Sequence, residues 1–432
     1  MGFQQGLSGL NAASKNLDVI GHNIANTNTV GFKASRAEFA EMVASAIGAA
    51  GGSNAGIGVE VSAVAQQFGQ GNITITGNTL DVAINGSGFF KLQQPDGSSA
   101  YTRAGNFKLD KIGNLVTNNG AKVMGFPIDP ITGLRTASDP SPLSFPTAAP
   151  IPARQTSKIV AEFNLDARAK DAAGVPAVVG PPAIPAVPPT PRATYGTSIN
   201  VYDSQGVAKP VSLYFQKTAT ANTWDVYDTL DDPTAVPPVV GAPIGQITFD
   251  NNGAITGPAA VPPATGFVLA LTGVDPSPPN PNGLPPFDID ISLDGVTQFG
   301  SKFSVSDLSQ DGYASGELTG INVEASGMVM ARYSNGVTRA EGQIALANFR
   351  NPQGLLAVGD NAWVETFESG ASVIGTPTDG NYGALRSGAL EDSNVDLTAE
   401  LVNMMTAQRT YQANAQTIKT QDQVLSTLVN LR

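Results

Sequence analysis

The chain contains no cysteine among its 432 residues, so disulfide bonds, thiolate metal sites and cysteine nucleophiles are excluded. It has a single histidine, His22, and charged residues make up only 14% of the chain. One histidine cannot build a histidine-based metal site, and no serine and aspartate pattern around it indicates a catalytic triad. A phosphate-binding loop, a GxGxxG fingerprint and a GxSxG nucleophile elbow are also missing. We therefore expect no enzymatic activity and no cofactor.

Signals for targeting, membranes and nucleic acid are equally scarce. The first residues lack the basic segment and the apolar segment of a secretory signal peptide. No run approaches the roughly 18 apolar residues that a membrane-spanning helix needs. The net charge of −12 repels a phosphate backbone. We expect no membrane insertion, no nucleic-acid partner, and a protein that is either cytoplasmic or exported without a cleaved signal.

What the chain does have is turn-forming residues, with 47 glycines and 31 prolines. This composition predicts strands and exposed loops, and the length allows two to four domains. Residues 174–192 and 275–286 are rich in proline, which predicts extended surface loops, because proline cannot donate to a strand ladder. Residues 48–58 are rich in glycine, alanine and serine and predict a flexible connector.

The N-terminal end is predicted to be a helix. Apolar or small residues recur there at alternating steps of three and four, which predicts a helical seam. These residues are Leu10, Ala13, Leu17, Ile20 and Ile24. The pattern ends at the turn-forming residues 26–29. An ordinary amphipathic helix packed on its own domain would give the same short pattern.

The C-terminal end repeats this spacing over a longer stretch, at Leu397, Leu401, Met404, Tyr411, Ala415, Ile418 and Leu425. Ser393, Asn394 and Asp396 precede it as N-cap candidates. No glycine or proline interrupts it, so the helix is predicted to run for roughly 35 residues, or about 50 Å. We expect the two helices to pair and to leave apolar surface for polymerisation. The predicted polymerisation residues are Leu10, Ala13, Leu17, Ile20, Ile24, Leu397, Leu401, Met404, Tyr411, Ile418 and Leu425.

Between the helices the pattern is typical of strands, first at residues 72–76, 80–84 and 89–92. One pattern, an acidic residue followed three positions later by glycine and two positions after that by an apolar residue, recurs at Asp110, Asp250 and Glu324, and begins at Asp203. The acid accepts backbone N–H groups and the glycine supplies a positive φ, so these motifs predict β-hairpins.

Aspartates at 288, 290 and 294 alternate along one predicted strand. Calcium could use such carboxylates, but a strand with one face in water gives the same pattern, and residues 307–312 lack EF-hand spacing. A secreted calcium-binding β protein stays open as an alternative.

Both ends of the chain resemble the flagellar axial protein family. The resemblance lies in residues 9–13, 17–26 and 31–33 at one end and in residues 388–397 and 408–415 at the other. Within this family the chain length and residues 201–206, 342–349 and 416–422 are similar to those of hook subunits. A distal rod protein, which would form a straight tube and be much shorter, is the nearer alternative.

The resemblance implies an α+β, mainly β, fold with a terminal helical coiled-coil domain. Residues 1–30 and 390–432 would form that polymerisation domain, 31–71 a connector, 72–155 with 300–385 an inner β-rich domain, and 156–299 an outer inserted one. It implies a structural subunit that polymerises into a curved, flexible tube transmitting torque from rod to filament. The implied partners are further copies of the chain, rod and hook–filament junction proteins, the hook cap and the type III export apparatus. The implied location is extracellular, in the flagellar hook.

Overall fold

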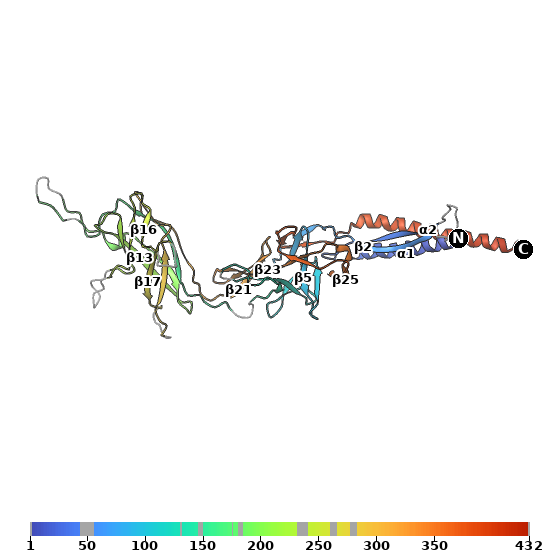
Figure 1. The fold of residues 1–432 in the computed structure, drawn as a ribbon, viewed down its shortest axis with the longest axis horizontal. Helices are drawn as coiled ribbons and strands as arrows, with labels where there is room; N and C mark the ends of the chain where they lie inside the picture. Colours follow the sequence, from blue (N-terminus) through green and yellow to red (C-terminus); the bar gives the residue numbers. More distant parts are fainter. Residues whose placement is uncertain are drawn as a thin grey trace. The chain divides into compact units, whose positions relative to one another are not determined.

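The computed structural model describes residues 2–43, 56–129, 132–145, 150–174, 176–179, 185–230, 241–259, 266–276 and 283–430. The chain forms two compact units. Unit 1 comprises Met1–Ala149, Leu318–Tyr333 and Thr338–Arg432, and unit 2 comprises Pro150–Glu317 and Ser334–Val337. Helices form the two ends of the chain and strands make up most of the rest (Figure 1). The predicted α+β, mainly β class is confirmed, whereas the three-part division of the chain stays a prediction.

The two terminal helices of unit 1 are α1 (Gly2–Ala25) and α2 (Leu397–Asn430). The helix α1 ends before the predicted turn, where the Asn26 N–H donates to the carbonyl of His22. The helix α2 is 34 residues long and begins after Asp396, whose carboxylate accepts the N–H groups of Thr398 and Ala399 at 2.9 and 3.2 Å. Asp396 is therefore the N-cap among the three candidates.

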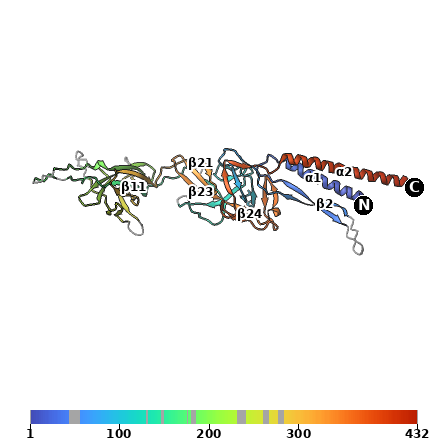
Figure 2. The same ribbon diagram turned by 90° about the horizontal axis from the view of Figure 1, so that it is seen from above.

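A β-hairpin follows α1, formed by strands β1 (Ser35–Val43) and β2 (Gly56–Gln66). It lies along the helices in both views (Figures 1 and 2). This differs from the connector expected at 31–71, because the glycine-rich composition that indicated a linker is concentrated between the two strands. Residues 44–55, which include most of the predicted flexible stretch 48–58, lie outside the described residues.

The rest of unit 1 is built mainly from strands around two buried apolar clusters. Its strands are β3 (Ile73–Ile75), β4 (Val82–Asn85), β5 (Phe89–Gln93), β6 (Ser99–Thr102), β7 (Lys108–Leu109), β8 (Leu115–Val116), β9 (Lys122–Pro127), β10 (Ser141–Pro142), β21 (Leu318–Val323), β22 (Met328–Tyr333), β23 (Thr338–Ile344), β24 (Leu346–Asn348), β25 (Leu356–Gly359), β26 (Ala362–Val364), β27 (Val373–Gly375), β28 (Ala384–Ser387) and β29 (Ala389–Glu391). The main sheet runs β21-β22-β23-β9-β5-β6-β26-β25. Phe90, Leu92 and Phe107 lie in its buried core. The late strands β28 and β29 pair with the early strands β4 and β3, so the two ends of the chain close this unit together.

Unit 2 has two five-stranded sheets that share one apolar core. Its strands are β11 (Lys158–Asp166), β12 (Gly196–Tyr202), β13 (Ala208–Lys217), β14 (Thr223–Tyr227), β15 (Gly245–Phe249), β16 (Ile255–Gly257), β17 (Val268–Val274), β18 (Phe287–Ser292), β19 (Thr297–Phe299) and β20 (Ser304–Gln310). Strands β12 to β16 form an antiparallel meander, whereas β11 pairs in parallel with β18 and β19. Phe163, Phe215 and Trp224 fill the space between the sheets, as expected for two sheets packed face to face.

The predicted hairpin motifs are confirmed. Asp110, Asp203 and Asp250 each accept two backbone N–H groups of their own turn through one carboxylate oxygen, at 2.8–2.9 Å. The following glycines, Gly113, Gly206 and Gly253, have φ values of 83–93°, which disfavour any residue with a Cβ.

The strand β18 alternates buried apolar residues with exposed Asp288 and Asp290, which is the pattern of a strand with one face in water. Within the described residues, no group of three or more histidine, cysteine, aspartate or glutamate side chains could hold a metal ion. Of the proline-rich loops, residues 175, 180–184 and 277–282 lie outside the described residues, and the described residues 176–179 are exposed. Within the part of the chain that the structure describes, neither helix has the length and apolar character to cross a bilayer.

Candidate assembly site and its anchoring junction

The helices α1 and α2 pack antiparallel. Asn23 near the end of α1 contacts Glu400 near the start of α2, whereas Gly6 and Gly9 lie against Ile418 and Asn414. A Cβ atom at Gly9 would lie 2.9 Å from the carboxamide of Asn414, so a side chain at this position would have to displace that carboxamide. Glycines of α1 therefore face side chains of α2 at this contact. Since α2 is the longer helix, its last residues extend beyond the start of α1 (Figure 1).

The predicted seam residues fall into three classes of exposure. Ala13 and Ile20 are buried, and Leu10, Leu17, Ile24, Met404 and Ile418 are partly buried. Leu397, Leu401, Tyr411 and Leu425 are exposed, together with Val402, Met405 and Val424, and these α2 side chains keep 38–54% of their surface. The structure thus brings Ile418 against α1 and leaves most of the α2 seam uncovered in the single subunit.

The hairpin β1–β2 adds to this surface. It is held against α1 by a hydrogen bond from the Gln5 side chain to the carbonyl of Gly56 at 2.5 Å. The Ser8 hydroxyl accepts the N–H of Val59 at 3.3 Å. A groove of about 570 Å³ lies where the hairpin meets both helices, and its lining includes Ala12, Ala13, Phe39, Val59 and Ala407. Phe39, Met42 and Val64 of the hairpin are exposed as well.

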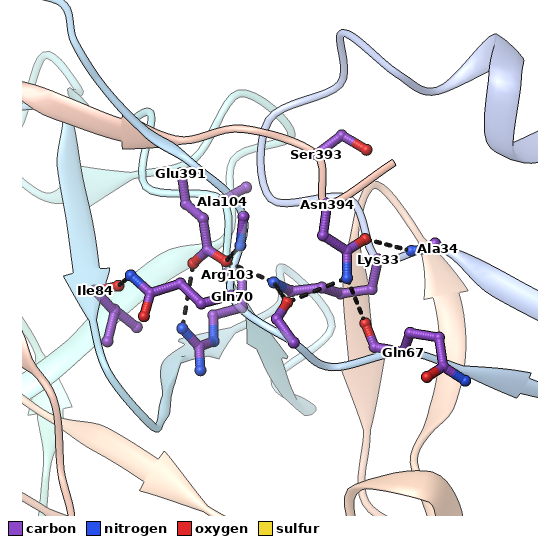
Figure 3. A network of polar contacts seen from close by, with 12 residues as sticks. Lys33, Ala34, Gln67, Gln70, Ile84, Arg103, Ala104, Glu391, Ser393 and Asn394 are labelled. Carbon is purple, nitrogen blue, oxygen red and sulfur yellow. Dashed lines mark hydrogen bonds and ion pairs between the residues drawn. The ribbon is translucent and has the colours of Figure 1, made fainter. Parts of the chain in front are cut away.

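At the base of the helices lies a buried charged cluster, which we call the junction: Lys33, Arg103 and Glu391 (Figure 3). The Lys33 ammonium contacts one carboxylate oxygen of Glu391 at 2.5 Å and donates to the Gly69 carbonyl at 2.7 Å. The Arg103 guanidinium contacts the other oxygen at 3.2 Å. The side chains of Lys33 and Glu391 are fully buried and that of Arg103 is 6% exposed.

The junction ties together segments that are far apart in the sequence. Besides the two cations, Glu391 accepts the N–H of Gly71 at 3.0 Å through its side chain and the N–H of Gly31 at 2.8 Å through its backbone carbonyl. Gly31 has a φ of 70°, and a Cβ atom there would lie 2.6 Å from the backbone nitrogen of Ala104. A Cβ at Gly71 would collide with the carbonyl oxygen of Asp392. Both glycines are therefore required for the chain ends to converge on the β-sheet part of unit 1.

Two asparagines complete this convergence. Buried Asn23 pairs with the backbone of Ser35 through both its amide nitrogen and its carbonyl oxygen, at 2.8 and 2.9 Å. Asn394 accepts the N–H of Ala34 at 2.7 Å and donates to the carbonyl of Gln67 at 2.7 Å (Figure 3). Asn23 thus fixes the start of the hairpin to α1, and Asn394 fixes its two ends to the segment before α2.

Burial dominates the electrostatics of the junction. It lowers the pKa of the Lys33 ammonium below its ordinary value, while the nearby Glu391 carboxylate acts in the opposite direction. The pKa of Arg103 is lowered for the same reason. The Glu391 carboxylate therefore stabilises two buried cations that burial alone would disfavour.

The junction residues were not among the predicted site residues. Lys33, Glu391 and Asn394 lie within the family motifs, but nothing local in the sequence indicates that they meet. The family motifs at the two ends of the chain both contain glycines near these residues. Such glycines often mark a close backbone approach, so they could have indicated that the two ends of the chain meet.

Comparison with protein families matches most of the chain to flagellar components. Residues 3–33 match the flagella basal body rod protein family, and residues 386–431 match the C-terminal region of flagellar basal body rod FlgEFG proteins. Residues 83–162 match the D1 domain of flagellar hook proteins FlgE/F/G, and residues 164–313 match the D2 domain of the flagellar basal body protein FlaE. With paired terminal helices and β-rich units between them, the chain has the organisation of a flagellar axial subunit.

The relatives define the family more closely. The flagellar hook protein FlgE of Escherichia coli K12 is 40% identical, with 100% of each chain covered. The hook protein FlgE of Treponema pallidum is 33% identical over 99% of this chain and 98% of its own. The crystal structure of Helicobacter pylori FlgE2 has a TM-score of 0.51 at 17% identity, covering 74% of this chain and 100% of that one, and supports the fold.

The chain belongs to the flagellar hook protein FlgE family. It is a structural, non-enzymatic subunit that is located in the bacterial flagellar hook and assembles into the flagellar axial structure. The hook prediction is thereby confirmed over the distal rod and calcium-binding alternatives.

Proposed function

We propose that the subunit polymerises through the apolar surface of the α1–α2 pair and the adjoining hairpin. The observation that carries this proposal is the row of exposed apolar side chains on α2, a helix that is already paired along α1. Several exposed apolar side chains on one element of a subunit that assembles point to the place where neighbours bind. Leu10, Leu17, Ile24, Leu401, Tyr411, Ile418 and Leu425 are the residues on which we expect assembly to depend most.

The exposed leucines would contribute free energy to such a contact. Full burial of one leucine is worth roughly 1.5–3 kcal/mol, so burying several half-exposed apolar side chains favours association and offsets part of its entropic cost. An aspartate in their place would bring an unpaired charge into an apolar contact, which costs several kcal/mol more.

The variant Leu401→Asp tests this proposal. We expect it to fold, because Leu401 is 46% exposed, and to form no tubes when expressed in cells lacking their own hook protein, as seen by electron microscopy. The matched control is Asn403→Asp, which puts the same charge at an exposed polar position of the same helix. Normal hooks from Leu401→Asp, with circular dichroism showing an intact α2, would contradict the proposal.

We further propose that the protein reaches an extracellular position through the flagellar type III apparatus without losing a signal peptide. Its direct neighbours would be further copies of itself, rod proteins, hook–filament junction proteins and, during assembly, the hook cap. The motif resemblance at both ends supports this proposal. The mass of the protein in purified hooks checks it, since removal of an N-terminal leader would lower that mass by the leader's residues.

A further inference from the structure

The junction lies where the helical pair meets the β-sheet part of unit 1. The helix α1 ends at Ala25, a few residues before Lys33, and α2 begins at Leu397, shortly after Glu391. Arg103 belongs to the turn after strand β6 of the main sheet. One carboxylate thus contacts a cation next to α1 and a cation of the sheet, and it is itself carried by the segment that leads into α2.

We propose that Lys33, Arg103 and Glu391 are positioning residues that fix the direction in which the α1–α2 pair leaves the sheet, and that they thereby set the curvature of the assembled hook. The proposal rests on assembly through the helices, as set out above. It extends that function, because a buried site within each subunit would determine the curvature of the polymer, whereas the helical surface would determine how strongly subunits associate.

The directionality of the contacts supports this role. Both oxygens of Glu391 are engaged, one by Lys33 and the N–H of Gly71 and the other by Arg103. Charge-assisted hydrogen bonds require particular donor positions, whereas apolar contacts tolerate sliding and rotation. Donors from three segments around one carboxylate therefore leave little freedom for the segment that enters α2.

The charge balance indicates that stability alone does not explain the junction. Two cationic side chains share one carboxylate in a buried site, and the Nε of Arg103 has no hydrogen-bond acceptor among the described residues. Replacing buried ion pairs by apolar residues of similar size is often neutral or stabilising. A cluster of this kind fits the role of selecting one arrangement over others that would be nearly as stable.

Two variants separate positioning from stability. Glu391→Gln leaves two buried cations without a counter-ion, and we expect it to raise the population of the locally opened terminal region roughly 100-fold or more, measured by amide hydrogen exchange in α2. The triple variant Lys33→Met, Arg103→Met and Glu391→Gln removes all three charges together. We expect its exchange rates to lie within about tenfold of the original protein, because no buried charge is left unpaired.

The decisive measurement is hook curvature in electron micrographs of cells that express the triple variant. We expect hooks in normal numbers whose curvature is altered or varies between cells. Arg339→Met is the control, since it removes an ion pair of the same unit on strand β23, away from the helices. It should leave curvature unchanged.

Hooks of normal, uniform curvature from the triple variant would overturn the proposal and leave the junction a purely structural element. Failure of the folded triple variant to assemble would also overturn it, because positioning residues would then be needed for assembly itself. Neither result bears on the helical surface, which the Leu401→Asp variant tests separately.

Discussion

Two of the glycines of α1, Gly9 and Gly21, have very different surroundings, and this difference can be measured. A Cβ atom at Gly9 would lie 2.9 Å from the carboxamide of Asn414 on α2, whereas nothing lies within 4 Å of a Cβ atom at Gly21. Replacing either glycine by leucine gains roughly 0.8 kcal/mol of helix propensity. At Gly9 the larger side chain also pushes α2 away, and overpacking of this kind costs about 1–3 kcal/mol.

The two leucine variants should therefore differ by about 1–3 kcal/mol in the local stability of α1, with Gly21→Leu the more stable. Amide hydrogen exchange followed by mass spectrometry measures this difference, which corresponds to roughly 5- to 150-fold in the protection of α1 amides. Urea unfolding of both proteins is the control, because the core of unit 2 should be unaffected. Equal protection of α1 in the two variants would refute the close packing of α1 on α2 at Gly9.

Two further predictions concern single polar side chains. Burial raises the pKa of the Tyr101 hydroxyl to about 12, so its stabilising effect should be complete below pH 10 and fall by roughly 2–3 kcal/mol as the pH rises from about 10 to about 12. The difference in unfolding free energy between the original protein and Tyr101→Phe should then change over this pH range, with the original protein losing stability relative to the variant, and a constant difference would contradict the assignment. Asp203→Ala should destabilise unit 2 by about 1–3 kcal/mol, because two turn N–H groups lose the carboxylate that accepts them at 2.9 Å. The urea midpoint of unit 2 measures this loss, and an unchanged midpoint would show that water replaces the carboxylate.

Features encoded by neighbouring residues were predictable from the sequence. The cap at Asp396, the end of α1 and the turns at Asp110 and Asp250 all depend on side chains within a few positions of the backbone groups that they bind. The family motifs at the two ends then indicated the class of protein.

Features that depend on distant residues were not predictable. Lys33 and Glu391 are 358 positions apart, and no local pattern indicates that they pair. The hairpin β1–β2 was missed because the glycine-rich stretch between its strands dominated the composition. The helix contact was expected to involve leucines, but it also uses Gly6 and Gly9, which lie against the side chains of Ile418 and Asn414.

The pairing of β3 with β29 and of β4 with β28 has a consequence for the order of folding. Unit 2 is drawn almost entirely from one continuous stretch of chain, so its contacts are available as soon as that stretch has been made. Unit 1 closes only when its last strands reach partners that precede them by about 300 residues, and loop closure over such distances slows folding. A growing chain therefore cannot complete the α1–α2 pair until it is nearly finished, so the surface that we propose for assembly is the last part to form.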